Sequence, residues 1–128
     1  MKVLALDYGS ARTGVAVSDP TGTVARPLEV VERAGSGAGL DRLVQLIREE
    51  EPARIVVGLP LTLSGDVGEQ ARETEEFLAE LREHVDVPVE TFDERFTTKL
   101  AGPGADDARA AAVLLTGYLE WRESRGER

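Results

Sequence analysis

The 128-residue sequence predicts an α/β fold: a mixed five-stranded sheet with helices on both faces. Two observations support this prediction. The N-terminal part holds three short apolar segments separated by turn residues, a pattern typical of strands joined by hairpins. The remainder alternates strand-like apolar segments with stretches of helical periodicity, which is typical of parallel strands joined by crossover helices. The predicted order of elements is therefore β-β-β-α-β-α-β-α.

The first half of this order comes from three strand-like segments and one helical segment. We expect strands at residues 2–7, 14–18 and 23–32, with a short glycine-containing turn between the first two. Pro27 has no N–H to donate to a strand ladder, so the third strand should carry a bulge or lie at a sheet edge. After a glycine-rich loop, apolar residues at helical spacing predict a helix over residues 40–51.

The second half begins with a continuous apolar run at residues 55–60, the signature of a strand buried on both faces. Asp66 stands three residues before Glu69, a spacing typical of a capping box at a helix start. Another strand is expected at residues 87–92. A final helix is expected from residue 106 to about residue 123, which completes the βαβ part of the fold.

Length and composition fit one domain over residues 1–123 with a polar tail over residues 124–128. The chain has no cysteine, which excludes disulfides and thiolate metal sites. It shows no leader-like N-terminus and no apolar run of membrane-spanning length, so we expect a cytoplasmic protein with no membrane partner. The net charge of -9 argues against strong nonspecific binding to nucleic acid, although several basic residues lie beside the acidic residues described next.

Acidic residues end or begin three of the predicted elements. Asp7 closes the first strand, just before a glycine-rich turn. Asp93 and Glu94 follow the last strand, and Asp107 opens the final helix. The carboxyl ends of parallel strands share one edge of a sheet, so these carboxylates can meet there. They would repel one another unless protonated or bridged by cations, and oxygen ligands suit Mg²⁺ or Mn²⁺. Such ions can activate water for phosphodiester hydrolysis.

Each acidic residue also has a structural alternative. Asp106 is an alternative to Asp107 as a ligand, and both residues also suit an N-cap and a first-turn partner of the helix dipole. The acid pair after the last strand would instead form an ion pair with Arg12 or Arg95. The structural alternative for Asp7 is a carboxylate whose hydrogen bonds stabilise the fold. These alternatives stay open at the level of sequence.

Four motifs follow one another over residues 2 to 122. They are Asp-Tyr-Gly-Ser-Ala-Arg-Thr-Gly-Val-Ala-Val-Ser-Asp at residues 7–19, Val-Val-Gly-Leu-Pro-Leu at 56–61 followed by Gly65 and Gly68, Asp-Glu-Arg-Phe-Thr-Thr at 93–98, and Asp107 with Ala110, Ala111, Leu114, Leu115, Tyr118 and Leu119. They resemble the motifs of the YqgF/RuvX family, in the same order. The resemblance implies an RNase H-like fold related to the Holliday junction resolvase RuvC. It also implies a metal-dependent endonuclease that matures the 5′ end of pre-16S rRNA or resolves branched DNA.

Carried over motif by motif, the resemblance implies that Asp7, Glu94 and Asp107 are the catalytic, metal-binding acids. Asp93 is the alternative metal ligand to Glu94, and strand alternation places these two residues on opposite faces. We favour Glu94 and leave Asp93 open. The basic and hydroxyl side chains beside these acids are candidates for binding substrate phosphates, and they are Arg12, Arg95, Thr97 and Lys99.

Two features depart from related enzymes. RuvC-like enzymes carry an acid on the strand that corresponds to residues 55–60, and this family has none there. The segment from residue 99 to 106 is shorter than the Lys/Arg-rich stretch of most relatives, which removes cationic charge where a phosphate backbone would lie.

Two other hypotheses stand beside the nuclease. One is a noncatalytic protein that binds nucleic acid or ribosomal particles through an incomplete site. The other is a nucleotide-binding fold of the actin or sugar-kinase type, which needs two such lobes. RNA versus DNA as substrate, and monomer versus homodimer, stay open.

Overall fold

The computed structural model describes residues 1–59, 68–93 and 108–126, and it confirms the predicted order of elements. No helix in this part of the chain is long and apolar enough to cross a membrane. The predicted capping box is wrong: the helix begins at Glu69 with Gly68 as its N-cap, so Glu69 is the first helical residue and not the third. Asp66 and the first two residues of the predicted final helix lie outside the described residues. The elements are β1 (Val3–Asp7), β2 (Arg12–Ser18), β3 (Ala25–Glu32), α1 (Gly37–Glu50), β4 (Arg54–Leu59), α2 (Glu69–Arg82), β5 (Val89–Asp93) and α3 (Ala108–Ser124).

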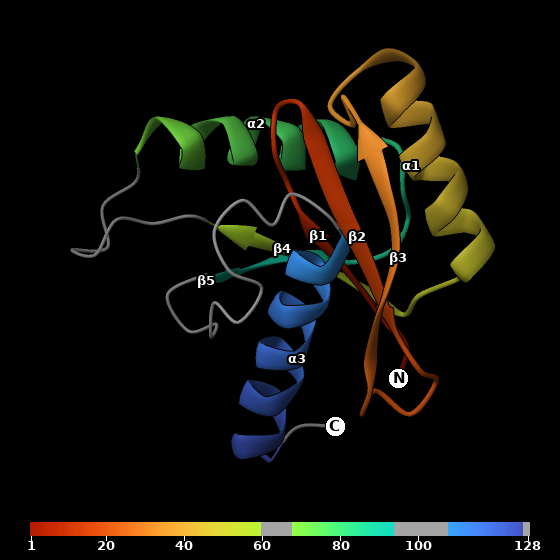
Figure 1. Cartoon of the computed structure of the whole chain (residues 1–128), viewed down its shortest axis with the longest axis vertical. Coiled ribbons are helices and arrows are strands. Elements are labelled where there is room, and N and C mark those ends of the chain that lie inside the picture. The colour runs from red at the N-terminus through yellow and green to blue at the C-terminus, as the bar shows by residue number, and fades with distance from the viewer. Residues whose placement is uncertain (60–67, 94–107, 127–128) are drawn as a thin grey trace.

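The sheet is mixed, as predicted, and its strand order is β3-β2-β1-β4-β5 (Figure 1). β1 pairs antiparallel with β2, where Asp7 is opposite Gly14, and parallel with β4, where Leu6 is opposite Val57. β4 pairs parallel with β5. The carboxyl ends of β1, β4 and β5 therefore lie at one edge of the sheet, which we call the carboxyl edge.

The prediction that Pro27 marks a bulge or a sheet edge is confirmed in both respects. β3 is an outer strand of the sheet. Val15 pairs with Glu29 whereas Ala16 pairs with Pro27, so Leu28 is an extra residue on β3. The bulge accommodates a residue that cannot donate a ladder hydrogen bond.

Helices cover both faces of the sheet, with α1 and α2 on one side and α3 on the other (Figure 1). The alternation of β1 shows how one strand serves both cores. Leu4 and Leu6 pack on the α1/α2 side, and Val3 and Ala5 pack on the α3 side. Because both faces are apolar, the central strands read as continuous hydrophobic runs in the sequence.

Tyr118 joins α3 to the amino-terminal ends of β4 and β5. Its ring is 1% exposed and packs edge-on against Phe92, with centroids 5.5 Å apart. Its hydroxyl donates to Glu90 and accepts hydrogen bonds from Nη1 of Arg54 at 3.1 Å and Nη1 of Arg122 at 3.2 Å. Burial and the Glu90 contact raise the pKa of the Tyr118 hydroxyl. The network anchors the C-terminal half of α3 on the sheet.

Tyr118→Phe is expected to lower the free energy of unfolding by about 1–3 kcal/mol, because it keeps the ring but leaves buried polar partners without their hydroxyl. Arg122, which is 8% exposed, loses an acceptor. Urea unfolding followed by circular dichroism measures this loss. Thr116→Ala on the exposed side of the same helix is the control. An equal loss of stability in both variants would show that the hydrogen bonds of Tyr118 do not stabilise the fold.

Candidate functional site

Asp7 is the last residue of β1 and lies at the carboxyl edge of the sheet. Strand alternation places it on the same face as Val3 and Ala5, which is the face covered by α3. Its side chain is partly exposed, whereas the four residues before it are fully buried. Its cross-strand partner on β2 is Gly14, which has no side chain to crowd the carboxylate. A partly exposed carboxylate at the end of a buried strand is well placed to bind a ligand.

The N-terminal end of α3 lies toward the same edge. The C-terminal half of this helix borders Met1 and the β2–β3 turn, which flank the opposite ends of the strands. α3 therefore runs antiparallel to β1, and its first described residue, Ala108, lies toward the carboxyl edge (Figure 1). The unpaired N–H groups of a helix N-terminus favour negative charge, including phosphate.

Asp93 is at the same edge but faces the other way. Phe92, the residue before it, is 5% exposed and packs against Tyr118 and Trp121 of α3, with ring centroids 5.5 Å and 5.6 Å away. Because alternate residues of a strand point to opposite faces, Asp93 projects toward the α1/α2 side. Asp7 and Asp93 thus end two strands separated only by β4, but they lie on opposite faces.

Of the predicted substrate-binding residues, the structure describes Arg12. This exposed residue begins β2 and lies two positions before Gly14, so it shares the face of Asp7. The part of the chain that the structure describes contains no group of three His, Cys, Asp or Glu residues able to hold a metal ion. The remaining predicted site residues lie outside the described ranges, and they are Glu94, Arg95, Thr97, Lys99, Asp106 and Asp107.

The turn after Asp7 is closely packed. The backbone N–H of Gly9 donates to Oγ1 of Thr13 at 3.4 Å, and the Thr13 hydroxyl donates to the Gly9 carbonyl at 3.4 Å. A Cβ at Gly9 would lie 2.5 Å from the carbonyl oxygen of Arg12, so this position requires glycine. The backbone N–H of Arg33 donates to the carbonyl of Ala11 at 3.0 Å and ties the turn to the end of β3.

Tyr8, the neighbour of Asp7, is a residue whose role sequence reasoning missed. Its ring stacks on Phe77 of α2, with centroids 4.3 Å apart and planes 16° from parallel. Burial, followed by the nearby charges of Glu73 and Glu76, raises the pKa of the Tyr8 hydroxyl. The sequence shows an aromatic residue directly after the acid. It does not show that this residue packs against Phe77, which lies far away in the chain.

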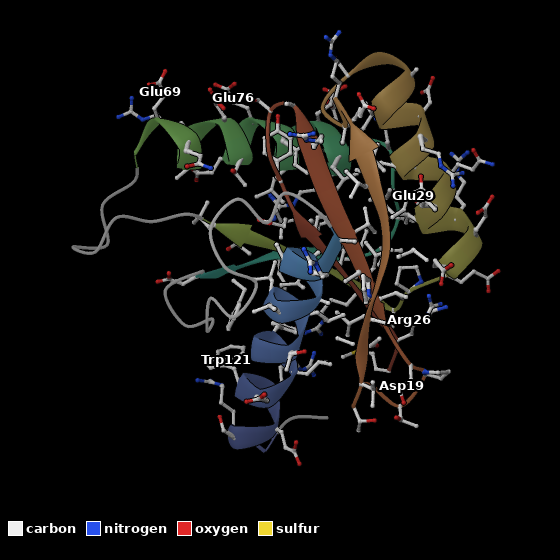
Figure 2. All side chains as sticks on the ribbon, in the orientation of Figure 1. Asp19, Arg26, Glu29, Glu69, Glu76 and Trp121 are labelled. Atoms are coloured by element: carbon white, nitrogen blue, oxygen red, sulfur yellow. The ribbon has the colours of Figure 1, made fainter. Side chains whose placement is uncertain are left out.

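Part of the acidic charge of the chain lies on α2. A stripe of exposed glutamates runs along the outer side of α2, where Figure 2 labels two of them, and α2 covers the face opposite to Asp7. The stripe consists of Glu69, Glu73, Glu76 and Glu80.

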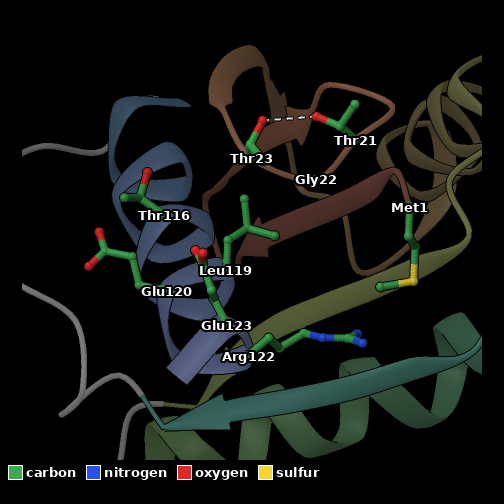
Figure 3. A pocket seen from close by; sticks show the side chains of 9 residues that line it. All are labelled: Met1, Thr21, Gly22, Thr23, Thr116, Leu119, Glu120, Arg122 and Glu123. Carbon is green, nitrogen blue, oxygen red and sulfur yellow. Dashed lines mark hydrogen bonds between the residues drawn. The ribbon is translucent and has the colours of Figure 1, made fainter. Parts of the chain in front are cut away.

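A cavity of about 170 Å³ lies between the C-terminal half of α3 and the β2–β3 turn (Figure 3). It is at the edge of the sheet opposite to Asp7, beside the start of β1. It is therefore separate from the candidate site at the carboxyl edge. Its lining residues are Met1, Thr21, Gly22, Thr23, Thr116, Leu119, Glu120, Arg122 and Glu123.

Comparisons with solved structures show the same fold. T. thermophilus RuvC in complex with a Holliday junction substrate matches with a TM-score of 0.62 and 19% identity, covering 97% of this chain and 96% of that one. The Fowlpox virus resolvase, in a complex with Holliday junction DNA, matches with a TM-score of 0.52 and 10% identity over 98% and 99% of the two chains. At these identities the likeness concerns the RNase H-like fold alone.

Sequence comparisons are closer. A protein of Roseiflexus sp. (strain RS-1) is 45% identical over 132 residues, covering 93% of this chain and 94% of its own length. A protein of Rubrobacter xylanophilus is 47% identical over 131 residues, covering 93% and 92%. Both carry the name "Putative pre-16S rRNA nuclease".

A family model described as "RuvX: Holliday junction resolvase" matches residues 1–121. This range contains Asp7, the turn after it and all the described elements except the end of α3. The family resemblance expected from the four motifs is therefore confirmed, and the chain belongs to the RuvX family.

Proposed function

We propose that this protein is a metal-dependent endonuclease that processes the 5′ end of pre-16S rRNA. The observation that carries the proposal is the position of Asp7, a partly exposed carboxylate that ends a central strand on the face toward which α3 begins. Membership of the RuvX family and the names of its relatives support the choice of nuclease over the binding-protein hypothesis.

In this proposal Asp7, Glu94 and Asp107 hold Mg²⁺ or Mn²⁺. The carboxylate of Asp7 fits such an ion, because hard divalent cations prefer oxygen ligands and the side chain is partly open to solvent. A bound divalent ion would polarise the phosphoryl group and lower the pKa of the attacking water. We assign the second ligand to Glu94 rather than Asp93, since Asp93 projects to the face opposite to Asp7.

Arg12 is proposed to bind a phosphate next to the scissile bond. Its exposed guanidinium shares the face of Asp7 and begins the strand that pairs with β1. Guanidinium groups recognise phosphate oxygens in a bidentate manner. Arg95, Thr97 and Lys99 are proposed to extend this contact along the nucleic-acid backbone. A substrate of this kind places the enzyme in the cytoplasm, beside ribosomal particles.

The second candidate substrate is a Holliday junction. It is favoured by the description of the family model and by the fold shared with resolvases solved on junction DNA. A junction has two-fold symmetry, so this candidate would require a homodimer that presents two sites. The rRNA candidate has no such requirement.

Cleavage assays that offer both substrates test the proposal. Labelled pre-16S leader RNA and a four-way DNA junction are incubated with the protein in Mn²⁺, Mg²⁺ or EDTA. We expect cleavage of the RNA near the mature 5′ end with either ion and none in EDTA, because like-charged carboxylates and phosphate need a bridging cation. Cleavage of the junction alone would select the second candidate. Binding of RNA by folded protein without any cleavage would contradict the nuclease.

A further inference from the structure

We infer that Tyr8 is a positioning residue, whose ring holds Asp7 on the α3 side of the sheet by packing against α2. The inference rests on the proposed function, because it concerns the alignment of the proposed catalytic acid. It assigns to α2 and Phe77 a role in the site, although both lie on the opposite face of the sheet.

The first observation is the contact itself. Tyr8 and Phe77 form a near-parallel stack at 4.3 Å, and Tyr8 joins the hydrophobic core between the sheet and α1/α2. Phe77 is 3% exposed and lies among the buried residues of α2. A stacked pair with one member fixed in the core limits the movement of the other.

The second observation is that the surroundings of Tyr8 are fitted to its ring. A Cβ at Gly35 would lie 3.2 Å from the Tyr8 hydroxyl, so the loop between β3 and α1 also approaches the ring closely. On the chain side, the next residue is Gly9, whose backbone is hydrogen-bonded to the buried Thr13. The ring, the loop and the turn together define one position for the backbone after Asp7.

Strand geometry converts this position into the direction of Asp7. Neighbouring residues of a strand point to opposite faces, and a slip of one residue exchanges the faces. Asp7 is the last residue of β1, so strand pairing holds the residues before it but not the residue after it. Tyr8 anchors the next position toward α2, and Asp7 is thereby directed toward α3. An acid misplaced by about 1 Å loses on the order of 100-fold in rate.

The contact uses the ring and not the hydroxyl. The contact with Phe77 is a ring-on-ring stack, and phenylalanine retains the ring that makes it. Tyr8→Phe should therefore preserve the position of Asp7, whereas Tyr8→Ala should release it.

The experiment compares Tyr8→Ala, Tyr8→Phe and Phe77→Leu with the wild type in Mn²⁺-dependent cleavage and in Mn²⁺ binding by calorimetry. For Tyr8→Ala we expect kcat to fall by about 10- to 100-fold with KM for the nucleic acid nearly unchanged, and a weaker Kd for Mn²⁺. Tyr8→Phe should stay within about twofold of wild type on every readout, since it retains the stack. Phe77→Leu keeps the core filled and should show an intermediate loss, which covers the case that Tyr8→Ala does not fold.

Leu81→Ala is the matched control. Leu81 is fully buried in the same core and on the same helix, one turn beyond Phe77, whose ring is the one stacked on Tyr8. It should lower Tm at least as much as Tyr8→Ala and leave kcat and the Kd for Mn²⁺ unchanged. Equal losses of kcat in Leu81→Ala and Tyr8→Ala at matched fraction folded would overturn the inference, because they would show a general effect of stability.

Hydrogen exchange separates this inference from the proposed function. The Gly9 amide should exchange faster in Tyr8→Ala than in wild type and Leu81→Ala, since its bond to Thr13 depends on the order of the turn. Unchanged exchange in Tyr8→Ala would overturn the inference whatever the activity. A wild type that neither binds Mn²⁺ nor cleaves, with Gly9 exchange still dependent on Tyr8, would remove the proposed function and leave only the ordered turn.

Discussion

Asp7→Asn is expected to abolish cleavage, with a loss of at least about 1,000-fold in rate, because a metal-held phosphoryl group loses several kcal/mol of transition-state stabilisation without its anionic ligand. The substitution keeps the size and shape of the side chain and removes only its charge. Because Asp7 is partly exposed, the amide can be solvated, and we expect Tm to stay within a few degrees of wild type. Single-turnover cleavage in Mn²⁺ and thermal unfolding measure the two effects.

Asp19→Asn supplies a matched acid at the opposite end of the molecule. Oδ1 of Asp19 accepts hydrogen bonds from the backbone N–H groups of Thr23 at 2.8 Å and Val24 at 2.9 Å, and Oδ2 accepts one from the Thr21 hydroxyl. This control should lower Tm and leave cleavage unchanged. A large loss of stability in Asp7→Asn, comparable with that of Asp19→Asn, would instead favour a structural role for Asp7.

The same control has a pH signature. Hydrogen bonds from the Thr21 hydroxyl, Val24 N–H and Thr23 N–H hold the pKa of Asp19 well below its usual value. A lowered folded-state pKa contributes stability above the unfolded value near 4, and this contribution is lost as the pH falls through and below that value. Asp19→Asn should therefore reduce the difference in stability between pH 7 and pH 3, measured by urea unfolding at both pH values.

Glu94→Gln is expected to reduce cleavage as strongly as Asp7→Asn, while Asp93→Asn retains most of the activity. The reason is the alternation of β5: Phe92 packs against α3, so Asp93 projects to the face that α3 does not cover. An acid on that face is directed away from an ion bound by Asp7. Both substitutions are isosteric, adjacent in the chain and remove one charge each, so each serves as the control for the other.

Metal binding makes this comparison independent of the substrate. Calorimetric titration with Mn²⁺ should give a weaker Kd for Glu94→Gln and an unchanged Kd for Asp93→Asn. Loss of Mn²⁺ binding in Asp93→Asn with retention in Glu94→Gln would reverse the assignment. Such a result would require Asp93 to reach around the edge of β5 to the face of Asp7.

The sequence determined the local elements well. Apolar runs, helical spacing and turn residues predicted all eight described elements, with boundaries within a few residues of those observed. Pro27 predicted the bulged outer strand because its missing N–H is a local property. Asp7 was identifiable for the same reason, since the end of a buried strand and a following glycine turn are visible in consecutive residues.

What only the tertiary structure decided is how these elements face one another. The faces of Asp7 and Asp93 follow from which core Ala5 and Phe92 enter, and this depends on packing against α3. The stack of Tyr8 on Phe77 and the bonding of Tyr118 to Glu90 join residues far apart in the chain. Local patterns arise from the backbone and its nearest neighbours, whereas the direction of a side chain toward a distant partner is set by the assembly of sheet and helices. The sequence thus identified the candidate acid, and the structure decided where it points and what holds it there.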